Sequence, residues 1–133
     1  MSASTNRALL EDVFAALENG DGKPFFELLS NDILWTISGT IAWSGTYRGK
    51  AAVQSQLWKP LFAQFAERYK AKAVRFVTEG DVVVVEFHGG AKTKSGLLYD
   101  NRYCWICTFD KGHITELTEY TDTHHVVTTL TSP

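Results

Sequence analysis

The sequence predicts an α+β domain in which helices cover one face of a curved antiparallel sheet. Apolar residues in the first half recur at helical spacing, whereas after about residue 70 they recur every second residue. Helices and strands are therefore segregated along the chain, which is typical of α+β domains. The 133 residues, 44% of them apolar and 21% charged, contain no repeat or linker. We expect residues 1–133 to form a single domain with a substantial core.

Three helices are expected before the main run of strands. In residues 5–18, Leu10, Val13, Phe14 and Leu17 have the i, i+3, i+4, i+7 spacing of one helix face. A short helix follows, with Asp21 as its cap, Pro24 in its first turn and FFELL as its body. A longer helix spans residues 50–68, and Pro60 should bend it.

The strands are expected to include one early strand and a later antiparallel meander. DILWTIS, residues 32–38, is the early strand, and the glycine-rich GTIAWSGTYRG that follows it is expected to be a loop. The meander is predicted from four segments with period two, joined by short turns: KAVRFVTEGD, VVVVEFHGG, GLLYDNRYCWICTF and HITELTEYTDT.

The last hairpin, YDNRYCWICTFDKGHITELTEYTDT, carries polar side chains that a plain sheet does not need. We expect residues 110–112 to form a three-residue loop with Gly112 left-handed, so that Phe109 faces His113. This register places odd-numbered residues of both strands on one face, with three cross-strand pairs: Tyr103 and Glu119, Trp105 and Leu117, Asn101 and Thr121. A one-residue slip would exchange the two faces.

This face brings a tyrosine, an asparagine and a carboxylate together beside apolar groups. Apolar surroundings raise the pKa of a carboxyl such as Glu119, which suits it to proton transfer. The hydroxyl of Tyr103 can donate to a developing oxyanion. The alternative is that Glu119 makes a structural hydrogen bond and nothing reacts.

Several other functional classes are not favoured. The net charge of −2 gives no case for a nucleic-acid partner, and no apolar run is long enough for a membrane span. The N-terminus lacks the pattern of a secretory signal, so we expect a cytoplasmic protein. Cys104 and Cys107 form a C-x-x-C, but residues three apart in a strand point to opposite faces and cannot share a metal. The four histidines show no ligand spacing, so we expect neither a metal nor a cofactor.

Several segments resemble the SnoaL-like, or ketosteroid-isomerase-like, superfamily. They are AALENGD with FFELLSND, WSGTYRGKAAV, and the closing hairpin, which resembles the ketosteroid-isomerase-related branch. The resemblance covers about residues 7–127 and is most specific in the hairpin. It implies a cystatin-like cone, in which a strongly bent sheet wraps an apolar pocket closed by helices. It also implies a homodimer paired through the outer sheet face.

The resemblance implies that the odd face of the hairpin points into the cone. Asn101, Tyr103 and Glu119 would then be the catalytic residues. The substrate-binding residues expected on the cone walls are Trp35, Trp58, Phe62, Glu86, His88, Trp105 and Leu117.

The resemblance does not extend to the catalytic set of true ketosteroid isomerases. Where those enzymes carry a general-base Asp, this chain has Thr36, Ile37 and Ser38, and their helix tyrosine is replaced by Val13 or Phe14. We therefore expect a cofactor-independent isomerase, cyclase or dehydratase that acts by proton transfer on an apolar carbonyl compound. A non-catalytic binder of an apolar ligand and a dimerisation module are the alternatives.

Overall fold

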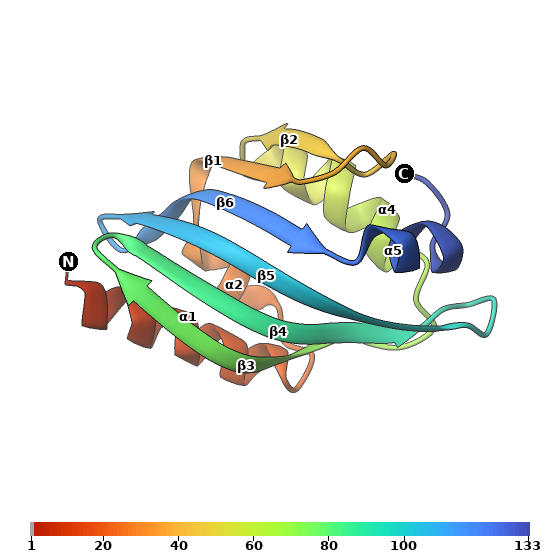
Figure 1. The fold of residues 1–133 in the computed structure, drawn as a ribbon, viewed down its shortest axis with the longest axis horizontal. Coiled ribbons are helices and arrows are strands. Elements are labelled where there is room, and N and C mark those ends of the chain that lie inside the picture. Colours follow the sequence, from red (N-terminus) through yellow and green to blue (C-terminus); the bar gives the residue numbers. More distant parts are fainter. Residues whose placement is uncertain (1) are drawn as a thin grey trace.

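The computed structural model describes residues 2–133 and contains one sheet of six strands in the order β2-β1-β6-β5-β4-β3. The strands are β1 (Leu29–Ile37), β2 (Gly45–Arg48), β3 (Lys70–Glu79), β4 (Val82–Lys92), β5 (Leu98–Asp110) and β6 (His113–Thr121). Figure 1 shows the curved sheet with helices against one of its faces, while the opposite face is left uncovered. The predicted α+β class is confirmed.

The helices pack on the sheet through apolar faces. They are α1 (Ala3–Leu17), α2 (Lys23–Leu28), α3 (Lys50–Ala52), the π-helical turn η1 (Val53–Trp58), α4 (Lys59–Phe62) and α5 (Thr123–Thr129). Helix α1 lies along β3 and β4 and buries Leu10, Val13, Phe14 and Leu17, the four residues expected on its inner face. Among the described residues no helix is long and apolar enough to cross a bilayer.

Two helix ends follow from local chemistry. The first helix begins at Ala3, two residues earlier than expected, because the Ser2 hydroxyl accepts a hydrogen bond from the Thr5 backbone N–H. The last helix begins after Asp122, whose carboxylate caps it by accepting a hydrogen bond from the His125 N–H.

The third helix differs from the expectation near Pro60. Its middle widens into η1 before the proline, where the Lys59 N–H reaches back to the Gln54 carbonyl. A proline ring clashes with the carbonyl four residues earlier, and the wider turn relieves that clash. The helix also ends at Phe62 rather than near residue 68, because Ala66 N–H donates to the Lys92 carbonyl instead.

Two expectations about the strands are wrong. The loop expected after the early strand contains β2, which pairs with β1 and places Tyr47 beside Trp35. The sheet is also not wholly antiparallel, because β1 runs parallel to β6. Parallel neighbours need a long crossover, and here the whole of the intervening chain supplies it. This pairing brings Ile37 opposite Glu119, which links the early strand to the candidate site.

The final hairpin has a different register from the one expected. A two-residue turn with both Lys111 and Gly112 left-handed (φ 50° and 80°) puts Asp110 opposite His113. A bulge at Thr115 then adds one residue to β6, so Trp105 faces Glu119 and Tyr103 faces Thr121. The two changes shift the pairing by two residues in total. Odd-numbered residues therefore still share the inner face, although His113 is exposed and Ile114 is buried instead.

Candidate functional site

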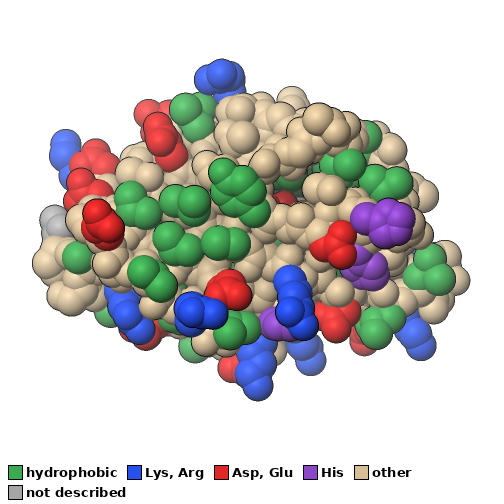
Figure 2. All heavy atoms as spheres, in the orientation of Figure 1, with side chains coloured by type: hydrophobic (Ala, Val, Ile, Leu, Met, Phe, Trp, Pro, Cys, Tyr) green, Lys and Arg blue, Asp and Glu red, His purple; other side chains and the backbone are tan. Residues whose placement is uncertain are grey.

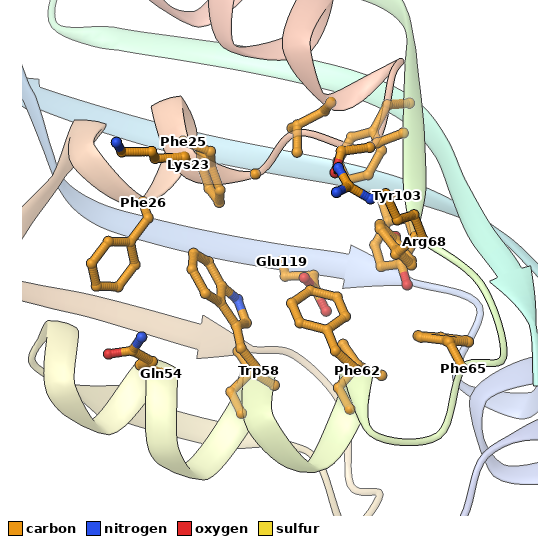
Figure 3. Close-up of a pocket in the computed structure, with 18 of the residues that line it drawn as sticks. Lys23, Phe25, Phe26, Gln54, Trp58, Phe62, Phe65, Arg68, Tyr103 and Glu119 are labelled. Carbon is orange, nitrogen blue, oxygen red and sulfur yellow. The ribbon is translucent and has the colours of Figure 1, made fainter.

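A cavity of about 520 Å³ lies between the sheet and the helices. Residues from the α1–α2 turn, α2, η1, α4 and the segment after α4 line its walls, and β1, β4, β5 and β6 form its floor. Figure 3 shows Phe25, Trp58 and Phe62 pointing into it from opposite helices. Its largest aromatic side chains pack on one another, with Phe25 stacked on Trp105 at 5.0 Å between ring centroids and Trp35 edge-on to Trp105 at 5.2 Å.

Glu119 is the one buried carboxylate among residues 2–133, with 8% of its surface exposed. It projects from β6 into the aromatic part of the cavity (Figure 3). Its Oε1 accepts a 2.8 Å hydrogen bond from the indole Nε1 of Trp105 on the neighbouring strand. Burial raises the pKa of Glu119 from 4.5 to about 7, although the N–H groups of Trp105 and Trp35 partly oppose the shift. Near neutral pH the carboxyl is therefore present in both protonation states.

Trp35 stands on the other side of Glu119, on β1. Its side chain is 2% exposed, and its Nε1 has no hydrogen-bond partner among the described residues. A buried N–H without a partner is uncommon and unfavourable. The Trp35 N–H opposes the rise in the pKa of Glu119, although it forms no hydrogen bond with the carboxylate.

A second group of polar side chains joins Tyr99, Asn101 and Tyr103 on β5. The hydroxyls of Tyr99 and Tyr103 are 2.5 Å apart, and Asn101 Nδ2 donates to the Tyr99 hydroxyl at 3.0 Å. Tyr103 also lines the cavity and stacks on Phe87 at 4.8 Å. Burial raises the pKa of Tyr103 well above its usual value, so its hydroxyl stays protonated and can donate.

Tyr69 lies beside this group and depends on a glycine. It lines the cavity from the segment before β3, and burial raises its pKa well above the usual value. A Cβ on Gly89 would collide with the Tyr69 hydroxyl, so the absence of a side chain at Gly89 makes room for it.

The structure brings together many of the residues expected at the site. The lining includes Trp35, Trp58, Phe62, Tyr103, Trp105 and Glu119. Leu117 is buried in the core, outside the lining. Asn101 is 2% exposed and also lies outside the lining, because its amide is engaged by Tyr99, by the Asp122 carbonyl and by the Arg102 N–H.

The expectation that Glu86 and His88 face the interior is wrong. The buried residues of β4 are Val83, Val85, Phe87, Gly89 and Ala91, all odd-numbered, so Glu86 and His88 lie on the outer face. Glu86 there accepts from Arg75 at 2.6 Å. Phe87 shares its parity with Val83 and Val85, whereas the polar Glu86 and His88 share theirs with Val82 and Val84, so the alternation of the strand itself favours the odd face as the inner one.

Other cavity residues were not singled out from the sequence. Phe25 and Phe87 are ordinary core aromatics by pattern, and Lys23 and Arg68 look like surface cations. Nothing in their spacing indicated that they meet around one cavity.

Metal-binding arrangements are not formed by the described residues. Across residues 2–133, no three His, Cys, Asp or Glu side chains gather as metal ligands do. Cys104 and Cys107 are both free thiols and lie on opposite sheet faces, as strand geometry predicts. Burial raises the pKa of both thiols, so neither is an activated nucleophile.

Comparison with known proteins agrees with this architecture. Residues 10–117 match the SnoaL-like domain family. No match was found among curated proteins.

Solved structures share the fold across nearly the whole chain. An NTF2-like protein of unknown function from Burkholderia pseudomallei has a TM-score of 0.81 at 18% identity, covering 96% of this chain and 98% of that one. A candidate SnoaL-like polyketide cyclase from Jannaschia has a TM-score of 0.77 at 18% identity, covering 98% and 94%. TerC, co-crystallised with polyporic acid, has a TM-score of 0.75 at 18% identity, covering 90% and 93%. The cone of six strands closed by helices, together with the match over residues 10–117, shows that this chain belongs to the SnoaL-like family.

Proposed function

We propose that this protein is a cofactor-independent enzyme that transfers a proton on an apolar carbonyl compound bound in the cavity. The reaction would be an isomerisation, a cyclisation or a dehydration. One observation carries the proposal: Glu119 lies in an aromatic cavity with a pKa raised to about 7. A general base or acid is most effective when its pKa lies near the working pH.

Glu119 would act as the base. Trp105 holds Oε1, so Oε2 is available to take a proton from the carbon next to the substrate carbonyl. The C–H bond breaks and its electron pair moves into the carbonyl group, whose oxygen becomes an enolate oxygen. In an isomerisation, the protonated Glu119 then returns the proton to a different carbon. The surrounding aromatic side chains exclude water from this exchange.

Tyr103 would stabilise the enolate oxygen. When Tyr99 donates its hydroxyl proton to Tyr103, the Tyr103 O–H is free to donate to a substrate oxygen in the cavity. Asn101, which was expected to hold the substrate, instead donates to the Tyr99 hydroxyl. We therefore assign Asn101 a positioning role, acting through Tyr99. Donors fixed in place before the reaction stabilise developing charge most effectively.

The family supports a small-molecule role. TerC shares this fold and was co-crystallised with polyporic acid, and a candidate polyketide cyclase shares it too. A volume of about 520 Å³ is within the usual range for sites that hold small organic ligands.

A generic substrate tests the chemistry without knowledge of the natural one. 2-Tetralone is an apolar ketone with acidic protons next to its carbonyl, and their exchange in D₂O is followed by proton NMR. We expect the protein to accelerate the exchange and Glu119→Gln to remove the acceleration. Glu116→Gln, an exposed change on the same strand, is the matched control. Acceleration that survives Glu119→Gln would exclude Glu119 as the base.

The two alternatives give different results in the same experiment. A non-catalytic binder would shift the 2-tetralone resonances without accelerating exchange. A dimerisation module with a filled interior would show neither effect, and the size of the cavity argues against it.

We further propose that two copies pair through the outer sheet face. Apolar side chains are exposed there, including Val74 and Val77 on β3, Ile106 on β5 and Tyr120 on β6. Figure 2 shows apolar side chains grouped on this uncovered face. Grouped apolar side chains on a soluble domain commonly mark an interface.

A further inference from the structure

The mouth of the cavity carries an arginine without a carboxylate partner. Arg68 lies in the segment between α4 and β3 and is part of the cavity lining. Figure 3 shows the Arg68 side chain among those that line the cavity, and it is exposed to solvent. Among residues 2–133, no carboxylate forms an ion pair with Arg68.

The turn before α2 holds the Arg68 stem in place. Gly20 is left-handed (φ +81°), and a Cβ there would lie 3.0 Å from Arg68 Cδ, so the stem packs where a side chain would otherwise stand. Arg68 Nη1 donates to the Gly20 carbonyl at 3.3 Å. A guanidinium has five N–H donors, so most of them are left for another acceptor.

The neighbouring charges do not neutralise Arg68. Glu67 also lines the cavity, but its Oε1 accepts the Lys92 backbone N–H at 2.8 Å. Lys23 adds a second cation to the lining, and its contact with Glu27 is long (3.9 Å) and exposed. A protein with a net charge of −2 thus places two cations at this mouth.

The interior offers no comparable group for an anion. No Lys or Arg among the described residues is buried, and the one buried charge is the carboxylate of Glu119. An anionic group on a ligand would be repelled by ionised Glu119 and would lose its hydration in the aromatic part of the cavity. At the mouth the same group stays hydrated and meets Arg68.

We propose that the substrate is an apolar acid, whose carboxylate stays at the mouth on Arg68 while its carbonyl end reaches Glu119. This inference rests on the proposed function, because it assigns the substrate class for the same cavity. Arg68 then sets both the preference for acids and the direction in which they enter.

A pair of probes that differ only in charge tests the inference. 6-Acetyl-2-naphthoic acid carries a carboxylate at one end and a ketone at the other, and its methyl ester lacks the charge. We expect isothermal titration calorimetry at pH 7.5 to show the acid binding about tenfold more tightly than the ester, as one exposed charge-assisted contact provides. High salt should narrow this difference, because the mouth is open to solvent.

Two variants assign the preference to Arg68. Arg68→Gln should remove the difference between acid and ester by lowering the affinity for the acid to that for the ester. Arg102→Gln, an exposed arginine on the outer sheet face, should preserve the difference and is the matched control. Equal binding of the two probes to the unmodified protein would overturn the inference, and so would a preference that survives Arg68→Gln.

The experiment separates this inference from the proposed function. If acids are preferred through Arg68 but Glu119→Gln has no effect on 2-tetralone exchange, the cavity binds acids without the proposed chemistry. If exchange depends on Glu119 but the two probes bind equally, only the substrate class is wrong. If neither probe binds, the inference is overturned and the cavity is not a site for ligands of this size.

Discussion

The indole Nε1 of Trp105 donates a 2.8 Å hydrogen bond to Oε1 of Glu119, from the residue directly opposite it on the adjacent strand. The sheet itself therefore places the donor, and no loop is needed to hold it. The bond favours the ionised carboxylate, while the aromatic surroundings favour the neutral acid. The balance of these two effects sets the pKa of Glu119.

Removing the Trp105 donor should raise the pKa of Glu119 further. Trp105→Phe keeps an aromatic ring but removes the indole N–H that donates to the Glu119 carboxylate. Loss of one hydrogen bond to a charged group is expected to raise the pKa by about one unit. Carbon NMR of the isotope-labelled glutamate side chains across a pH titration measures the pKa of Glu119. Trp43→Phe, a buried tryptophan outside the cavity lining, should leave the pKa unchanged.

Glu119 should make the fold less stable as the pH rises. Its pKa is higher in the folded protein, at about 7, than its ordinary 4.5, so the folded state binds more protons between these values. Glu119 contributes most to the stability of the fold below pH 4.5, and this contribution is lost as the pH rises towards 7. Glu119→Gln cannot titrate. The free energy of unfolding of this variant, relative to that of the unmodified protein, should therefore increase by about 2 to 3 kcal/mol from pH 5 to pH 8.

Urea unfolding at the two pH values tests this linkage. Glu116→Gln on the same strand is exposed and should show no such change. A stability difference between Glu119→Gln and the unmodified protein that is the same at pH 5 and pH 8 would contradict a raised pKa for Glu119.

Tyr103→Phe should slow proton transfer more than it weakens binding. The change removes the donor proposed for the enolate oxygen, and loss of one such donor typically costs on the order of 10²-fold in rate. The 2-tetralone exchange rate and its saturation by ketone measure the two effects separately. Tyr120→Phe, on the exposed outer face, is the control. A loss confined to affinity would assign Tyr103 to binding alone.

Asn101→Ala should lower the stability of the fold. Asn101 is buried, and its removal leaves the Asp122 carbonyl and the Arg102 N–H without these partners. An unsatisfied buried polar group costs about 1–3 kcal/mol, measured here by urea unfolding. Thr121→Ala, which removes an exposed hydroxyl contact to Arg102, should cost less. An unchanged midpoint would show that these hydrogen bonds contribute little.

Ile106→Lys should separate the proposed dimer. Ile106 lies on the outer face of β5 and is 36% exposed in the single chain. A charge buried in an apolar interface without a partner is strongly unfavourable. Light scattering after size-exclusion chromatography should show the unmodified chain at twice the monomer mass and the variant at the monomer mass. A monomeric unmodified chain would exclude the dimer.

The inner face of the last hairpin could be predicted even though its register could not. The expected three-residue loop was replaced by a two-residue turn and a bulge at Thr115, which together shift the pairing by an even number of residues. Side chains alternate with period two, so an even shift preserves the face. Tyr103, Trp105 and Glu119 therefore line the cavity as expected, but Glu119 pairs with Trp105 rather than with Tyr103.

The sequence by itself determined the α+β class, the inner face of α1 and the placing of Tyr103, Trp105 and Glu119 on one face of the last hairpin. Each depends on short-range spacing, which the chain carries locally. Tertiary structure alone decided the parallel pairing of β1 with β6 and the meeting of Arg68, Lys23 and Glu119 around one cavity. These features depend on contacts between segments far apart in the chain, and packing of the whole sheet against its helices selects among local alternatives of similar free energy.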